Sequence, residues 1–107
     1  MTTFDRREEA FERHLVLDEE LRFRAIARRN RRLGKWAAGL LGLEGMAVED
    51  YENALIAADL EEAGEEDVFR KLRSDFDAKG LSVSDHQIRR QMNDLLEAAL
   101  TELKSGG

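Results

Sequence analysis

Apolar side chains recur along most of this chain at intervals of three and four residues, which places them on one side of an α-helix. The set Val68, Leu72 and Phe76 shows this spacing clearly, and another set starts at Ile88. Glycines stand between such sets, and glycine ends helices because it adopts the left-handed backbone without steric penalty. The pattern predicts an all-α protein, a four-helix bundle preceded by a short, partly disordered N-terminal helical arm.

The expected arm occupies residues 1–17. Thr2 can cap a helix there, and Phe4, Phe11 and Leu15 recur at i, i+7 and i+11 on one helical face. A helix of about 13 residues is marginal in water when isolated, so the free arm is expected to fray. Two interpretations stay open from the residues alone: the arm folds back as ordinary core, or its apolar stripe docks in the groove of a partner.

Residues 18–104 are expected to form the bundle, with residues 105–107 as a disordered tail. Asp18 is expected to cap a long helix over about 18–41, which the glycines that follow would end. The positions expected to face the core are Leu21, Ala25, Leu33, Trp36, Ala37, Leu40, Tyr51, Leu55, Ala58, Val68, Phe69, Leu72, Phe76, Ile88, Met92, Leu95, Leu96, Ala99 and Leu103.

Three further helices are predicted after the first glycine-rich turn. One covers about 48–61, the next begins at Glu65 and ends near Gly80, and the last runs to about 103. Ser84 and Gln87 have the spacing of a capping box and mark the start of the last helix.

Charge and composition exclude several classes of protein. The 107 residues contain no Cys and no Pro and carry a net charge of −6. Without Cys there is no disulfide framework, thiolate metal site or cysteine nucleophile. Residues 4–14 are mostly charged and so form no secretory signal, and no apolar stretch approaches the roughly 20 residues of a membrane-spanning helix. We therefore expect a soluble protein that is not exported and does not insert into a membrane.

The charges are also unevenly distributed. Residues 21–43 contain seven bases and no acid, whereas residues 44–69 contain ten acids and no base. Because oppositely charged neighbouring blocks suit antiparallel helices, we expect the basic run from Arg22 to Lys35 to pair largely within the domain. The alternative is a small helical binding module for nucleic acid or another anionic surface, with the basic helix as its contact.

The sequence contains no motif that indicates a catalytic site or a metal site. His14 and His86 are far apart in the sequence, and the acidic stretch after Asp59 lacks the ligand pattern of a calcium loop. Gly34 and Lys35 are not followed by the Ser or Thr of a phosphate-binding loop. We therefore expect no enzyme activity, metal or cofactor, and at most weak, unspecific binding of ATP or ADP to the arginine-rich helix.

Several residue strings resemble the zeta subunit family, the alphaproteobacterial ATPase inhibitor of the F-type ATP synthase, and the resemblance covers roughly residues 1–104. The long central string is unusual enough to be specific. The strings are Thr2-Thr3-Phe4-Asp5, Ala10-Phe11-Glu12, Asp18-Glu19-Glu20-Leu21-x-Phe23, Ala27-Arg28-Arg29-Asn30, Leu33-Gly34-x-Trp36-Ala37-Ala38, Ala57-x-Asp59 and Glu66-Asp67-Val68.

The resemblance implies an N-terminal inhibitory segment, here Thr2 to about Leu17, that enters a catalytic α/β subunit interface and blocks ATP hydrolysis. The implied partner is the head of the ATP synthase, with its α, β and γ subunits, at the cytoplasmic face of the inner membrane. Alone, the protein is expected to be a monomer that binds no nucleic acid. The residues expected to bind the partner are Thr3, Phe4, Arg6, Arg7, Glu8, Phe11, Glu12 and Leu15.

Overall fold

The computed structural model describes the backbone of residues 3–61 and 65–106 and the side chains of residues 19–59 and 65–106. Its helices are α1 (Thr3–Leu41), α2 (Met46–Glu61), α3 (Glu65–Lys79) and α4 (Asp85–Lys104). The described residues contain no strand. The predicted all-α, four-helix architecture is confirmed.

Helix α1 is the main departure from the sequence-based expectation. It runs without interruption from Thr3 to Leu41, so the helix start predicted at Asp18 is not found. An N-cap contributes only about 1 kcal/mol, and no Gly or Pro stands between Thr3 and Leu33 to interrupt the backbone hydrogen bonds. The arm and the first helix of the bundle are therefore one helix, while the proposed domain boundary at residue 17 stays a prediction.

Glycines end α1 and α3 as predicted. Gly42, Gly45 and Gly80 have φ angles of 76°, 60° and 75°, in the left-handed region that favours glycine. The amide of Leu43 donates to the carbonyl of Ala38 at 2.9 Å, and the same six-residue closure recurs at the end of α3.

The two ends of α4 are also defined by local hydrogen bonds. The predicted capping box is present: the Gln87 amide donates to Ser84 Oγ at 3.1 Å, and the Ser84 amide donates to Gln87 Oε1 at 2.9 Å. At the other end, the Ser105 amide donates to the Thr101 carbonyl at 3.1 Å. Ser105 thus caps α4 at the start of the segment predicted as a tail, and Gly107 lies outside the described residues.

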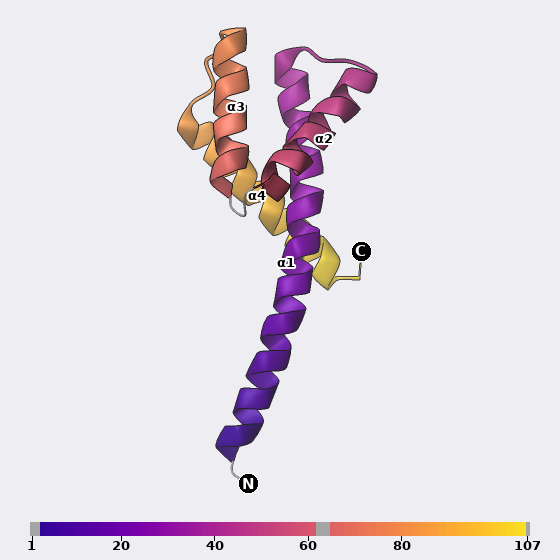
Figure 1. The fold of residues 1–107 in the computed structure, drawn as a ribbon, viewed down its shortest axis with the longest axis vertical. Helices are drawn as coiled ribbons and strands as arrows, with labels where there is room; N and C mark the ends of the chain where they lie inside the picture. The colour runs from indigo at the N-terminus through magenta and orange to yellow at the C-terminus, as the bar shows by residue number, and fades with distance from the viewer. Residues whose placement is uncertain (1–2, 62–64, 107) are drawn as a thin grey trace.

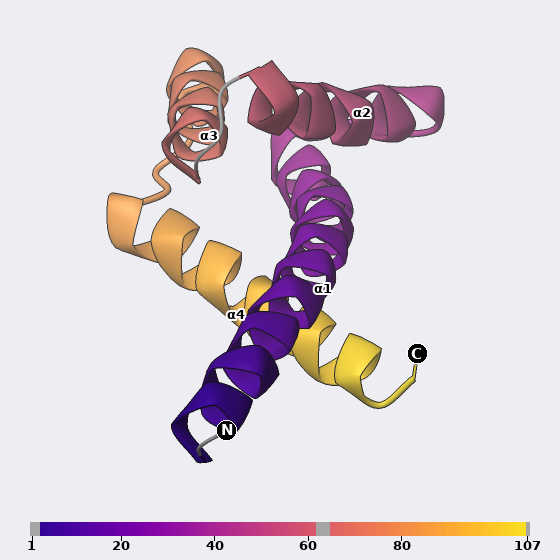
Figure 2. The same ribbon diagram turned by 60° about the horizontal axis from the view of Figure 1, so that its bottom comes forward.

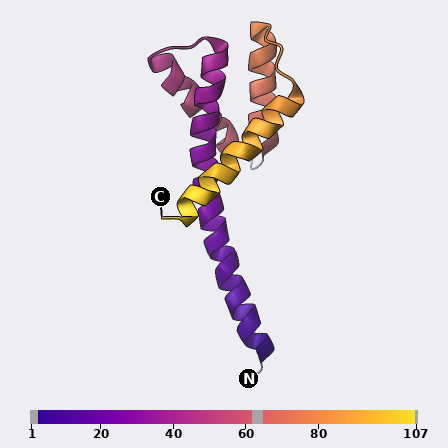
Figure 3. The same ribbon diagram turned by 180° about the vertical axis from the view of Figure 1, so that it is seen from behind.

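The C-terminal half of α1 forms the spine of the bundle. Helix α2 packs on one side of it and α4 crosses it on another, while α3 lies between α2 and α4 (Figures 1 and 2). The N-terminal half of α1 extends beyond the other three helices (Figure 3), and the molecule measures 62 × 25 × 23 Å. The fold is a compact bundle with one projecting helix.

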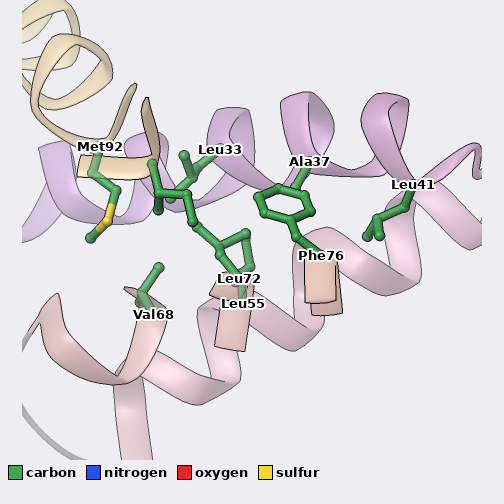
Figure 4. Packing of buried hydrophobic residues seen from close by; sticks show 9 residues of the cluster. Leu33, Ala37, Leu41, Leu55, Val68, Leu72, Phe76 and Met92 are labelled. Atoms are coloured by element: carbon green, nitrogen blue, oxygen red, sulfur yellow. The ribbon is translucent and has the colours of Figure 1, made fainter. Parts of the chain in front are cut away.

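All four helices contribute to the core (Figure 4). Trp36 and Phe76 meet edge to face, with ring centroids 5.7 Å apart and planes at 89°, an arrangement favoured by the ring quadrupoles. Every buried apolar residue among those described lies between Ala25 and Ala99. The central cluster comprises Leu33, Ala37, Leu41, Leu55, Val68, Leu72, Phe76, Ile88 and Met92.

Most of the predicted core positions are confirmed, and two assignments on α1 are wrong. Leu40, predicted to face inward, is 42% exposed, and Leu41 is buried in its place. The true inward line is Leu33, Ala37 and Leu41, at i, i+4 and i+8. Arg29, which is not among the positions expected to face the core, is fully buried, because α1 is covered on more than one side rather than along a single stripe.

Candidate interaction surface on helix α1

The predicted partner-binding residues all lie on the projecting part of α1. The backbone there is helical from Thr3 onward, but these side chains lie outside the part of the chain whose side chains the structure describes. Their roles therefore stay predictions. The residues concerned are Thr3, Phe4, Arg6, Arg7, Glu8, Phe11, Glu12 and Leu15.

The basic run that follows on α1 divides into a buried, a paired and an exposed part. Arg29 is the buried member: its Nε donates to Asn30 Oδ1 at 2.9 Å and its Nη1 to Glu65 Oε1 at 3.2 Å. Its Nη2 has no hydrogen-bond partner among the described residues. Two directional hydrogen bonds hold this guanidinium between α1 and the start of α3.

The paired members tie α1 to α4. Arg32 binds Glu102 through two hydrogen bonds of 2.6 Å, in the parallel geometry that suits a guanidinium and a carboxylate, and Arg28 Nη1 donates to the same carboxylate at 3.1 Å. The hydrogen bond from Arg32 is the main cause that holds the pKa of Glu102 below its usual value, with the charge of Arg28 acting in the same direction. Glu102 thus joins two turns of α1 to the last turns of α4.

The basic run pairs within the domain as expected, in part with the neighbouring acidic block and in part with a carboxylate outside it. From the acidic block, Glu65 binds Arg29 at 3.2 Å, and Glu52 lies 3.9 Å from Arg31. The closest pairs instead involve Glu102, which lies outside that block. Its separation of 70 residues from Arg32 explains why no local sequence pattern identifies it.

A second polar cluster joins α2 and α3 at the opposite end of the bundle. The Tyr51 hydroxyl donates to Asp75 Oδ2 at 2.7 Å, and Lys71 lies 3.1 Å from the same carboxylate and 5.2 Å from the Tyr51 ring centroid. Burial, and then the hydrogen bond to Asp75, raise the pKa of Tyr51 above its usual value. A tyrosine that stays protonated and donates a hydrogen bond to a carboxylate acts as a structural link between the two helices.

Ion pairs also join α3 to α4. Arg73 reaches Asp77 at 2.7 Å on its own helix and Asp85 at 2.9 Å on the next. Arg89 pairs with Glu66 at 3.0 Å, and its guanidinium lies 4.0 Å from the centroid of the Phe69 ring. These ion pairs fix α3 against the first turns of α4.

The exposed part of the basic run lies beside a solvent-facing aromatic residue. Arg22, Arg24 and Lys35 are exposed and make no ion pair within the described residues. Phe23 is 68% exposed, and sequence periodicity gives it no role because it falls outside the Leu21 and Ala25 spacing. A groove opens beside it between α1 and the end of α4, which we call the Phe23 groove, lined by Phe23, Arg24, Ala27, Arg28, Leu103 and Gly106.

Neither a metal site nor a membrane-spanning helix is found in the described parts of the chain. No group of three or more His, Asp or Glu side chains there is placed to hold a metal ion. No described helix is both long and apolar enough to cross a bilayer. The features that remain as candidates for function are the projecting N-terminal half of α1 and the groove at its base.

Comparison with known proteins gives a family for this arrangement. The family model described as ATPase inhibitor subunit zeta matches residues 1–102. Among curated proteins, no sequence matches. A solution NMR structure of a protein has a TM-score of 0.68 to this chain and 36% sequence identity, and the match covers 81% of this chain and 99% of the other.

Proposed function

Since the chain belongs to the ATPase inhibitor subunit zeta family, we propose that it blocks ATP hydrolysis by inserting the N-terminal part of α1 into a catalytic α/β subunit interface of the F-type ATP synthase head. Inhibition by insertion of a helix needs no catalytic residue in this chain. The bundle would anchor and orient the inserted helix.

The projection of α1 is the observation that carries this proposal. The N-terminal half of α1 extends away from the other three helices of the bundle (Figures 1 and 3). At about 1.5 Å per residue, the stretch from Thr3 to Leu17 is about 21 Å long. A helix of this length can enter a subunit interface while the bundle stays outside it.

The sequence of this projecting segment is suited to such a contact. Phe4, Phe11 and Leu15 recur at a spacing that places them on one side of a helix. Large apolar side chains buried at the centre of an interface commonly dominate its affinity. Arg6 and Arg7 would meet acidic groups of the partner, so the segment offers both apolar anchors and charged contacts.

Inhibition would be conformational. A helix held in one catalytic interface would also block it sterically and freeze its conformation, so inhibition needs no contact with the reacting phosphate. Residues of the arm lose conformational entropy when they become fixed on binding. This ordering costs about 2–5 kcal/mol of the gross interaction energy. Modest changes in the segment can therefore change affinity strongly.

The test is ATP hydrolysis by the purified ATP synthase head, titrated with the full chain and with a variant carrying Phe4→Ala, Phe11→Ala and Leu15→Ala. Alanine favours the helix, so the variant keeps α1 and loses the anchors. We expect the wild-type chain to inhibit and the variant to require at least a hundredfold higher concentration. Equal inhibition by both chains, or none by the wild type, would contradict the proposal.

The matched control removes an exposed apolar side chain that lies far from the N-terminal half of α1. Met46 is 77% exposed at the opposite end of the bundle, at the start of α2. Met46→Ala removes a solvent-facing apolar side chain without altering α1, so its inhibition curve is expected to coincide with that of the wild type.

A further inference from the structure

We infer that the Phe23 groove is a second docking site for the same partner, and that it receives an apolar side chain flanked by a carboxylate at the rim of the subunit interface that α1 enters. This inference rests on the proposed function. It assigns a contact to the bundle, beyond the N-terminal segment.

The position of the groove along α1 is the first reason. Phe23 lies six residues beyond Leu17, which corresponds to about 9 Å along the helix axis. The C-terminal end of α4 crosses α1 at this level (Figures 1 and 3). A partner that surrounds α1 as far as residue 17 therefore meets the bundle at this crossing.

The exposure of Phe23 is the second reason. Its ring is 68% exposed, whereas the other phenylalanines whose side chains are described are buried or half-buried. Burying an aromatic side chain is worth several kcal/mol at most, and interfaces are enriched in such residues. On an ideal helix Phe23 lies about a quarter turn from Leu15, so a partner covering the apolar side of the arm reaches it by extending about a quarter of the way round α1.

The charges around the groove indicate the chemistry of the occupant. Arg28 already binds Glu102 at 3.1 Å. Arg24 is exposed and has no ion-pair partner among the described residues. Ala27, one turn after Phe23 on α1, and Leu103 of α4 add apolar surface to the lining of the groove. An occupant that places an apolar side chain against Phe23 and Leu103 and a carboxylate beside Arg24 would match both the apolar and the charged lining of the groove.

The experiment measures binding and inhibition separately, with the full-length chain in every case. Binding of labelled chain to the purified ATP synthase head is followed by fluorescence anisotropy, and ATP hydrolysis is titrated in parallel. Phe23→Ala is expected to weaken binding about tenfold and to shift the inhibition curve equally, while maximal inhibition at saturation is unchanged. Arg24→Glu is expected to weaken binding at least fivefold, more at low salt than at high salt.

Each variant has a matched control. Met46→Ala removes an exposed apolar side chain far from the groove, and Arg22→Glu reverses an exposed charge two residues from Arg24 that does not line the groove. Both are expected to bind within twofold of the wild type. Because Phe23 and Arg24 are exposed, circular dichroism and thermal unfolding of their variants should match those of the wild type.

The outcomes separate this inference from the proposed function. If the wild type binds and inhibits but Phe23→Ala does so equally well, the groove is not a docking site, and the proposed function stands. If the wild type binds without inhibiting, the proposed function fails, and the binding of Phe23→Ala still decides the groove. If the wild type does not bind the head, both are rejected. A loss of self-association in Phe23→Ala, seen by sedimentation, would overturn the inference by showing that a second copy occupies the groove.

Discussion

Gly34 of α1 lies directly against Glu52 of α2. A Cβ atom at position 34 would come within 2.8 Å of the Glu52 Cα and 3.2 Å of its Cγ. The absence of a side chain at Gly34 therefore sets how closely the two helices approach, and it brings the carboxylate of Glu52, which is 5% exposed, to 3.9 Å from Arg31.

Gly34→Ala is expected to destabilise the protein by about 1–3 kcal/mol, because the new methyl group meets backbone atoms that cannot move aside without separating the helices. This holds although alanine favours a helix over glycine by about 1 kcal/mol. Gly39→Ala on the same helix meets nothing within 4 Å and should be neutral or slightly stabilising. Urea unfolding of both variants measures the difference, and equal stability of the two would contradict the close packing.

Arg29→Lys is expected to lower the free energy of unfolding by about 1–3 kcal/mol. A single ammonium group cannot take the place of Nε and Nη1, which donate to Asn30 and Glu65 at once, and hydrogen bonds to charged groups contribute about 1.5–3 kcal/mol each. Arg22→Lys, at an exposed position, should change stability by less than about 0.5 kcal/mol. Chemical denaturation of the two variants is the measurement, and similar stabilities would show that the buried guanidinium contributes little.

Glu102→Gln is expected to lower the unfolding temperature at neutral pH, because it removes the carboxylate shared by Arg28 and Arg32. The pKa of Glu102 is lower in the folded chain than its ordinary 4.5. Its contribution to stability is therefore complete above about 4.5 and disappears as pH falls through the lower, folded-state pKa.

Thermal unfolding between pH 7 and pH 2 tests this dependence. The difference between wild type and Glu102→Gln should shrink as the solution becomes acidic. Glu97→Gln is a suitable control, since Glu97 is exposed on the same helix and makes no ion pair in the described part of the chain. A difference for Glu102→Gln that stays constant to pH 2 would argue against the ion pairs as its cause.

Removal of residues 2–17 is expected to leave the unfolding temperature nearly unchanged, because the N-terminal half of α1 extends away from the other three helices (Figures 1 and 3). Leu72→Ala, within the central cluster, should instead cost about 2–5 kcal/mol. Differential scanning calorimetry compares the two. A large loss of stability on truncation would show that the N-terminal segment packs as part of the core.

Polyanion binding is expected to be weak. The chain carries a net charge of −6, and Arg28, Arg29 and Arg32 are bound to carboxylates of the chain itself. At about 0.1 M salt, where exposed charges are screened beyond about 10 Å, we expect no retention on duplex DNA or on vesicles of anionic lipid. Binding at that salt concentration, abolished by Arg24→Glu, would support the basic helix as an anionic-surface site.

Much of the fold could be predicted from the sequence because its determinants are local. The glycines at 42, 45 and 80 adopt the left-handed backbone conformation that their positions indicated, and Ser84 and Gln87 form the expected capping box. The weak signal at Asp18 was misleading, since one capping residue does not outweigh uninterrupted helix-forming residues on both sides of it.

The surface around α1 could not be predicted in the same way. Arginine is usually exposed, so the sequence gives no reason to expect Arg29 in the interior. It is buried because α3 begins beside it. Glu102 is 70 residues from Arg32, and the exposure of Phe23 depends on where α4 crosses α1. Each of these depends on contacts between helices that no periodicity specifies.

The sequence by itself determined the helices of the bundle, their glycine ends and most of the core, because backbone conformation and amphipathic spacing are properties of neighbouring residues. Tertiary structure decided which charges are paired, how closely α1 and α2 approach at Gly34, and that the other three helices pack around the C-terminal half of α1 so that its N-terminal half projects from the bundle. These features arise from the packing of helices, where residues far apart in the chain meet.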